Sequence, residues 1–203
     1  MTITWLGHAC FRLEQGGYSI IIDPYNSVTG YPDIQTEANA VWCSHGHHDH
    51  SYTAGVTLLP AGEDPFMVTE IPSFHDGEGG ALRGSNLIRV FEAEGVRVCH
   101  LGDLGHRLSA EQVSAIGPVD VLLVPVGGFY TIGPEDAKAV AEQSGPRCIV
   151  PMHYRHGHHG PDKIGGVEQF LKLFPGGDVT VLPGPSLTVT PETRGIVVPA
   201  WRG

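Results

Sequence analysis

The sequence has little positive charge and no long apolar run. Its 203 residues contain 12 Lys and Arg against 22 Asp and Glu, which gives a formal net charge of −10. The basic residues form no cluster, and tight binding to a nucleic-acid backbone needs clustered cations, so we expect no nucleic-acid partner. No stretch of 18 apolar residues and no charged-then-apolar leader occurs. We therefore expect no membrane association and a cytoplasmic location.

Paired cysteines are also lacking. The chain has no C-x-x-C spacing, and each of its four cysteines lies in or beside an apolar run: Cys10, Cys43, Cys99 and Cys148. Buried free thiols are the preferred interpretation, although the sequence alone does not exclude a disulfide. We expect no chemical role for these residues.

The sequence does contain enough apolar residues for a core. Hydrophobic residues make up 41% of the chain and charged residues 17%, which is typical of a globular protein, and the length fits one domain over residues 1–203. The segments "QGG" and "AEG" predict the turns of two hairpins. The first half is rich in short β-prone runs bounded by turn residues: residues 3–7, 10–14, 18–23, 40–44, 66–74, 86–92 and 96–103.

The second half alternates strand and helix patterns. Ser109 followed by Gln112 predicts a capped helix start, and Pro134 and Gly145 mark the two ends of another helix. A third helix is expected at 165–174. Further strands are expected at residues 119–126, 147–152, 179–183 and 186–190. This order predicts an α/β fold with two sheets packed face to face and helices outside.

Histidine is concentrated in one segment, "SHGHHDH", which directly follows an apolar strand. In an extended segment the side chains at 45, 47 and 49 share a face. A turn at Asp49 would bring His50 to the same cavity, whereas His48 would face away. Imidazole and carboxylate are ligands of zinc and similar ions, so the segment can give two ligands to each of two metals. A second dense segment, "MHYRHGHHG" at 152–160, is the next place to look.

The segment "SHGHHDH" resembles the signature of the metallo-β-lactamase superfamily, and further motifs of that family follow in order. "IIIDPY" is similar to its strand-end aspartate, "SFHD" to its third-motif histidine, "HLGD" to its bridging aspartate and "VPMHY" to its late histidine. "GHACFRLE", "VGGFYTIGPEDA" and "PMHY" resemble, more narrowly, the branch of small hydrolases that contains the ascorbate-phosphate lactonases. The resemblance covers nearly the whole chain. It implies an αββα sandwich of two mixed β-sheets with helices on the outer faces and metals at one edge.

The resemblance also implies a ligand set. The first metal would be held by His45, His47 and His75, and the second by Asp49, His50 and His153, with Asp103 bridging. From the residues alone His75 stays open, because His100 or His106 could take its place. Asp23 is expected to brace the histidine loop. Zinc is the expected metal and manganese the alternative.

Hydrolysis is the expected chemistry. Two metals about 3.5–4 Å apart can hold one bridging water and lower its pKa toward neutrality, which makes hydroxide available as the nucleophile. Asp49 is the expected catalytic residue, because it would orient that hydroxide and pass a proton to the leaving group. His8 and Arg155 are candidates for substrate binding. A guanidinium suits this role because it pairs with phosphate or carboxylate in a forked geometry.

The leading hypothesis is therefore a binuclear metal-dependent hydrolase of a small anionic ester, lactone or phosphodiester. A nuclease of the same fold should carry a basic stripe or an RNA-gripping arm, and a di-iron reductase should carry a flavin module and a carboxylate in place of His47. Exported β-lactamases have cysteine or histidine where this chain has Asp103. A non-catalytic metal-binding protein remains an alternative. The expected partner is a small-molecule substrate, whose identity the sequence does not give, and the native metal and the oligomeric state stay open as well.

Overall fold

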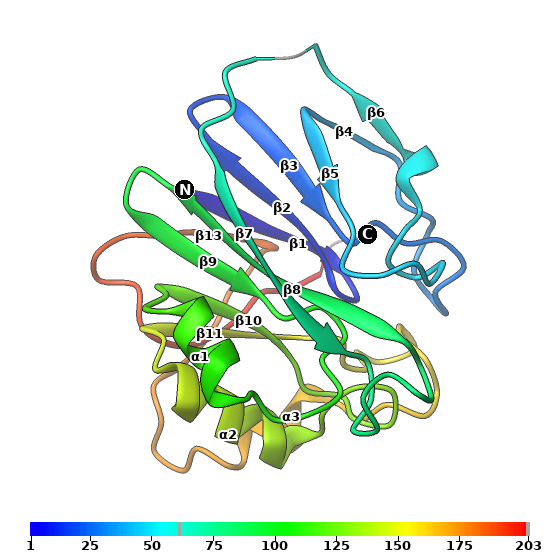
Figure 1. Ribbon diagram of the computed structural model, residues 1–203, viewed down its shortest axis with the longest axis vertical. Coiled ribbons are helices and arrows are strands. Elements are labelled where there is room, and N and C mark those ends of the chain that lie inside the picture. The colour runs from blue at the N-terminus through cyan, green and yellow to red at the C-terminus, as the bar shows by residue number, and fades with distance from the viewer. Residues whose placement is uncertain (61, 202–203) are drawn as a thin grey trace.

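Two β-sheets packed face to face form the body of the protein (Figure 1). The computed structural model describes residues 1–60 and 62–201. The first sheet contains, in spatial order, β13 (Ser186–Thr188), β1 (Thr2–Gly7), β2 (Cys10–Gln15), β3 (Tyr18–Ile22) and β5 (Ala40–Trp42). The second contains β12 (Val179–Val181), β14 (Gly195–Val198), β11 (Cys148–Met152), β10 (Val121–Pro125), β9 (Val96–His100), β8 (Ser85–Ala93) and β7 (Met67–Phe74).

Both predicted hairpins are present, and their turns show why. The β2–β3 turn is Gly16-Gly17, with φ of 60° and 83°, and the β8–β9 turn is Glu94-Gly95, with φ of 50° and 76°. Two-residue hairpin turns with positive φ at both positions match the twist of the flanking strands. Glycine reaches this region at no steric cost, which explains the glycines in both turns.

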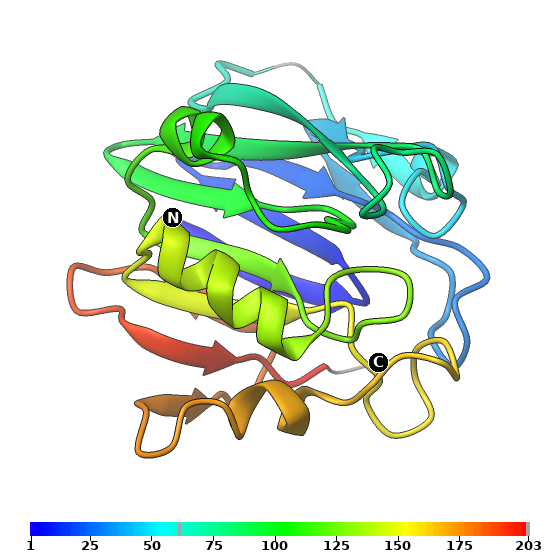
Figure 2. The ribbon, with the colours of Figure 1, turned by 60° about the horizontal axis from the view of Figure 1, so that its bottom comes forward.

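Three α-helices lie on the outer face of the seven-stranded sheet, on the near side in Figure 2: α1 (Ala110–Ile116), α2 (Pro134–Ser144) and α3 (Val167–Leu171). The predicted capping box is confirmed at α1, where the Ser109 hydroxyl accepts a hydrogen bond from the backbone of Gln112. Pro134 begins α2, and Gly145 ends it in the left-handed region. The third helix is shorter than expected, because the chain turns after Leu171. Among the described residues, no helix is long and apolar enough to cross a membrane.

The metallo-β-lactamase type of sandwich is confirmed, with one difference in its outer layers. In the described part of the chain, the outer face of the five-stranded sheet is covered by a loop and a small sheet rather than by α-helices. The small sheet pairs β4 (Thr36–Ala38) with β6 (Val56–Leu58), next to a short 3₁₀ helix, Thr53–Gly55. Buried loop side chains, among them Tyr25, Val28 and Tyr31, form a second apolar cluster there. That cluster shields the outer face of the five-stranded sheet from water, as the helices shield the outer face of the seven-stranded sheet.

The main core fills the space between the two sheets and the space between the seven-stranded sheet and its helices. It includes every residue of β10 except its last, which is also buried. The four cysteines are free thiols: Cys10, Cys99 and Cys148 are buried, and Cys43 is half-buried. The strand β14 and the small β4–β6 sheet were not predicted from the sequence.

Strand direction brings the chemically important residues to one edge. β1, β3 and β5 run in the same direction, as do β7, β9, β10 and β11. The residues that follow their carboxyl ends therefore gather where the sheets meet. A backbone hydrogen bond of 3.1 Å from His153 after β11 to His8 after β1 ties the two sheets together at this edge.

Candidate metal centre

Sharp turns at strand ends aim the side chains of the site inward. His8, Asp23 and His153 each follow a strand directly and have positive φ of 52°, 51° and 52°. Such conformations are strained for residues other than glycine and persist where the surroundings hold them. At His8 the backbone carbonyl accepts hydrogen bonds from the Trp5 indole and the His153 amide.

The first group of candidate ligands is His45, His47 and His75. One nitrogen from each ring lies within 4.8 Å of the other two, and His45 Nε2 is 3.1 Å from His47 Nδ1. His45 and His47 come from the bent segment after β5, and His75 comes from the residue directly after β7. The structure thus brings together the three histidines that the resemblance assigned to one metal.

The second group contains Asp49, His50 and His153, and also His8. Single atoms from these four residues lie within 4.8 Å of one another. A backbone hydrogen bond of 2.9 Å from His50 to His47 forms the turn that separates the two halves of the segment. The segment is a series of bends rather than the extended chain expected from the sequence. It nevertheless gives two residues to each group.

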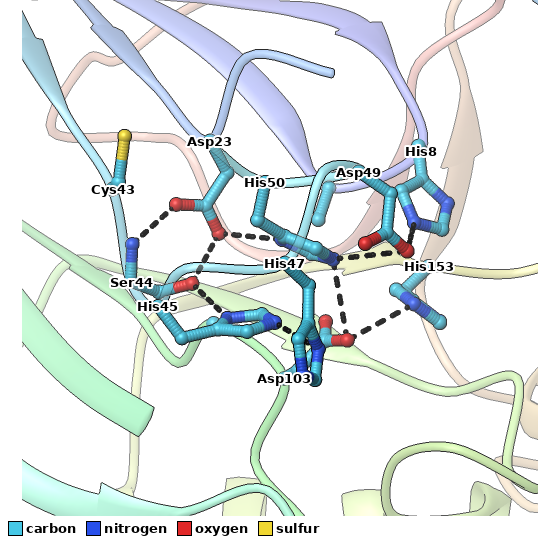
Figure 3. Close-up of polar contacts among 12 residues, drawn as sticks. His8, Asp23, Cys43, Ser44, His45, His47, Asp49, His50, Asp103 and His153 are labelled. Carbon is cyan, nitrogen blue, oxygen red and sulfur yellow. Dashed lines mark hydrogen bonds and ion pairs between the residues drawn. The ribbon is translucent and has the colours of Figure 1, made fainter. Parts of the chain in front are cut away.

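Asp103 lies between the two groups, as Figure 3 shows in part. Its Oδ2 is 3.1 Å from His75 Nε2, 3.2 Å from His50 Nε2 and 3.3 Å from His153 Nε2. Ligand atoms around a tetrahedral zinc, each 2.0–2.1 Å from the ion, lie about 3.3 Å from one another. The carboxylate oxygen therefore has the spacing of a ligand shared between the groups.

Unsatisfied polar atoms in the site test whether these residues fit metal ions. The described structure contains seven buried side-chain polar atoms without a hydrogen-bond partner, and six of them belong to His8, His50, His75, Asp103 and His153. A buried polar atom without a partner costs about 1–3 kcal/mol. Concentration of these atoms in one place, on imidazole and carboxylate donors, fits a centre that binds divalent metal ions.

A hydrogen-bonded brace holds the histidine segment. Asp23 Oδ2 lies 2.9 Å from His50 Nδ1, and the same carboxylate accepts hydrogen bonds of 2.6 Å from the backbone and the hydroxyl of Ser44 (Figure 3). Burial would raise the pKa of Asp23, but the hydrogen bond from His50 lowers it below its ordinary value. Asp23 fixes the His50 ring so that Nε2 faces Asp103, which is the bracing position expected for it.

Burial and neighbouring charges shift the pKa values of the site residues in opposite directions. Burial lowers the pKa of His45 to about 3, so its ring is neutral near pH 7 and able to bind a metal. Burial would also lower the pKa of His50, but the Asp103 and Asp23 carboxylates raise it well above the usual value. Burial would raise the pKa of Asp103, but His153 and His50 lower it well below the usual value. The two carboxylates thus favour positive charge at this position, which a bound cation would also supply.

The structure also distinguishes His75 from the histidines that could have replaced it. His100 is buried, and both of its ring nitrogens are used, by the Ala9 carbonyl and the Gly102 amide. His106 bonds the backbone of Phe74 and Arg107. Neither ring belongs to a candidate metal group among the described residues.

Comparison with known proteins assigns the family. Residues 2–153 match the family model of the beta-lactamase superfamily domain. The crystal structure of a proposed Zn-dependent hydrolase of the metallo-β-lactamase superfamily from Thermotoga maritima is 36% identical, with a TM-score of 0.78 and coverage of 99% of both chains. The chain belongs to the metallo-β-lactamase superfamily of metal-dependent hydrolases.

Curated relatives of this superfamily member extend over nearly the same length. A metal-dependent hydrolase from Methanoculleus marisnigri is 31% identical, and the match covers 96% of this chain and all of the relative. Another from Geobacillus thermodenitrificans is 27% identical, and the match covers 92% of this chain and 99% of the relative. The match therefore includes both histidine-rich segments and the strands that carry them.

In this metallo-β-lactamase fold, a cavity of about 450 Å³ opens over the metal centre. It is lined by Ser27, Val28, Thr29, His47, His48, Asp49, His75, Arg83, Asp103, Tyr130 and Pro161. His48, expected to face away, has a ring that is 68% exposed and belongs to this lining without joining either metal group. It lies at the rim, where it can meet a substrate but not a buried ion.

The two residues expected to bind substrate lie elsewhere. His8 is fully buried beside Asp49, with 3.5 Å between Nε2 and Oδ2, and it is not part of the cavity lining. Arg155 is also outside the lining, because its guanidinium pairs with Asp162 at 3.0 Å and bonds its own loop. The cation in the cavity is Arg83. The sequence motifs did not indicate it, since it lies in a glycine-rich loop, 76–84, with no pattern of its own.

Proposed function

We propose that this metal-dependent hydrolase is binuclear and acts on a small anionic ester, lactone or phosphodiester. The observation that carries the proposal is the position of Asp103 Oδ2, about 3 Å from histidines of both groups. A carboxylate shared in this way is suited to two neighbouring ions. Zinc is the metal that the imidazole-rich ligand set favours, and manganese is the alternative.

Two such ions supply a water of lowered pKa and polarise the scissile carbonyl or phosphoryl oxygen. The chain supplies the rest. Burial would raise the pKa of Asp49, but the nearby His8 and His50 rings keep it below its ordinary value, so the carboxylate is ionised. An ionised Asp49 at the cavity surface can accept a hydrogen bond from the attacking water and fix its direction. Once it has taken a proton from that water, it can pass the proton to the leaving group.

The remaining residues of the centre act by holding position. Asp23 keeps Nε2 of His50 directed at Asp103, and His8 lies against Asp49 on its buried side. The cavity walls limit the substrate to a small molecule, because a volume of about 450 Å³ is within the usual range for metabolite-sized ligands.

The test begins with metal analysis of protein purified without chelator. We expect about two divalent ions per chain, zinc or manganese. Panels of esters, lactones, phosphodiesters and thioesters should then reveal turnover that a chelator abolishes and zinc or manganese restores. A tightly bound flavin, or iron as the only metal after growth in zinc-replete medium, would contradict hydrolysis. Two ions with no turnover on any panel would favour the non-catalytic metal-binding alternative.

A further inference from the structure

Arg83 differs from most of the other described arginines in having no acidic partner. Eight arginines lie in the described residues, and six of them form ion pairs with a carboxylate: Arg12, Arg89, Arg97, Arg107, Arg147 and Arg155. Arg194 is exposed and bonds a turn carbonyl. Arg83 forms no ion pair in the described structure, although the net charge of the chain is −10. It is also the only Lys or Arg among the described residues that line the cavity.

The loop that carries Arg83 is built around one carboxylate. Asp76 follows His75 directly, and its two oxygens accept four backbone hydrogen bonds of 2.7–3.0 Å, from Glu78, Gly80, Leu82 and Arg83. A carboxylate satisfied by four amides holds the whole loop 76–84 in one conformation. The backbone of Arg83 is therefore fixed relative to the metal-site residue His75.

The side chain of Arg83 is held at one point and keeps donors free. Its Nη2 donates a 3.1 Å hydrogen bond to the Phe129 carbonyl, and its Cζ lies 6.0 Å from the centre of the Tyr130 ring. A guanidinium has five N–H donors in a planar fork. One is used in this contact, and the fork can still bind an oxyanion through two parallel hydrogen bonds.

Arg83 shares the cavity with two carboxylates of the candidate metal centre but pairs with neither. Asp49 and Asp103 also line the cavity, yet neither forms an ion pair with Arg83. The guanidinium fork is therefore not occupied by these carboxylates, and it can hold one anionic end of a molecule whose other end meets the candidate metal ligands.

We propose that Arg83 determines substrate specificity by binding a carboxylate or phosphate group that is separate from the scissile bond. This inference rests on the proposed hydrolase function and narrows its substrate class. The substrate then has two functional ends: an ester, lactone or phosphodiester at the metal centre, and a second oxyanion on Arg83. Binding energy at the second end positions the first end for attack.

A matched pair of probes tests the proposal on the full-length, metal-loaded enzyme. Mono-4-nitrophenyl glutarate carries a free carboxylate, and 4-nitrophenyl valerate is its neutral counterpart. We expect Arg83→Gln to lower the preference for glutarate over valerate, measured as the ratio of kcat/KM, by about 10–100-fold, as for a lost charge-assisted hydrogen bond. Arg83→Lys, which keeps the charge but not the fork, should fall between Arg83→Gln and the wild type. Arg194→Gln removes the other described arginine without an ion pair and should leave the ratio unchanged.

Competition identifies which oxyanion is preferred. Glutarate and glycerol 3-phosphate are compared as inhibitors. The compound whose inhibition constant rises more in Arg83→Gln shows whether Arg83 prefers a carboxylate or a phosphate. An equal loss of activity on both ester probes would overturn the proposal, because it would show a structural role. An unchanged ratio would overturn it as well.

The proposed hydrolase function and the proposed role of Arg83 can be tested separately. If the wild type with two metals turns over neither probe, the failure concerns hydrolysis. Calorimetric binding of glutarate and glycerol 3-phosphate to the wild type and Arg83→Gln then decides the role of Arg83. At least tenfold weaker binding of one of them by the variant supports it, and a smaller difference for both overturns it.

Discussion

The two histidine-rich segments of this protein are similar in composition, but their histidine side chains point in different directions. Residues 45–50 supply candidate ligands to both metal groups, whereas in residues 153–159 only His153 points into the centre. The rest of the second segment closes on itself through two backbone hydrogen bonds of 3.0 Å between His156 and His159. The His159 ring packs against Tyr31 and Trp201, with centroids 5.0 and 4.4 Å apart.

The difference shows that a high density of histidines does not by itself indicate a metal site. The position of the segment in the fold determines whether its side chains can bind a metal. Both segments follow a strand of the sandwich. In the first, Asp23 and Ser44 anchor the chain so that several rings face inward. In the second, Gly157 with φ of 62° lies within the turn that the His156–His159 hydrogen bonds close, and His156 and His158 on either side of it are exposed. Four experiments test this contrast.

The largest effect is expected at Asp49 in the first segment. Asp49→Asn keeps the shape of the side chain and removes its charge and basicity, so turnover should fall about 10²–10⁴-fold. The first metal group does not include Asp49, and metal analysis should show that ion largely in place. Equal activity of the variant and the wild type at full metal occupancy would refute the catalytic role.

A smaller effect is expected from the carboxylate that braces the first segment. Asp23→Asn should weaken metal affinity about 10–100-fold, because it removes the partner that orients His50. Chelator competition measures the affinity. The matched control is Asp162→Asn, which removes the carboxylate paired with Arg155 in the second segment. Loss of metal from the control would mean that the second segment also supports the centre.

Much of the fold and of the candidate site could be predicted from the sequence. The features that were missed depend on contacts between residues far apart along the chain. Hairpin turns and the α1 capping box depend on local chemistry, which neighbouring residues reveal. The full ligand set came from the family resemblance, and the residues alone left His75 open. Neither route indicated Arg83, because its place in the cavity depends on contact between loop 76–84 and Phe129, 46 positions away along the chain. For Arg155 the forked guanidinium was identified correctly, but a local partner, Asp162, occupies it.

The third experiment concerns pH and the metal-free protein. Burial lowers the pKa of His45 to about 3, below about 6.5 in the unfolded chain. As pH falls below 6.5, the unfolded chain binds a proton at this position and the folded chain does not, so the free energy of unfolding decreases. Between pH 6.5 and 5 the loss from one such group is about 2 kcal/mol.

Thermal unfolding at the two pH values measures this effect. At roughly 2–4 °C per kcal/mol for a chain of this size, the midpoint should fall by about 4–8 °C from this group. His45→Gln should reduce the shift relative to the wild type, and the comparison cancels the contributions of other groups. The exposed His156 in the second segment is the control, and His156→Gln should not alter the shift. An identical pH dependence of the wild type and His45→Gln would contradict burial as the cause.

The smallest effects are expected from the exposed histidines of the two segments. His48 and His158 are both exposed, and neither belongs to a candidate metal group. His48→Ala should change kcat/KM by no more than a few-fold, because the ring lines only the rim of the cavity, and His158→Ala should change nothing measurable. Both variants should keep the full metal content. Inactivity of His48→Ala with its metals retained would show that this ring contacts the reacting groups. Loss of metal from His158→Ala would remove the contrast between the segments, since a histidine directed outward would then be supporting the centre.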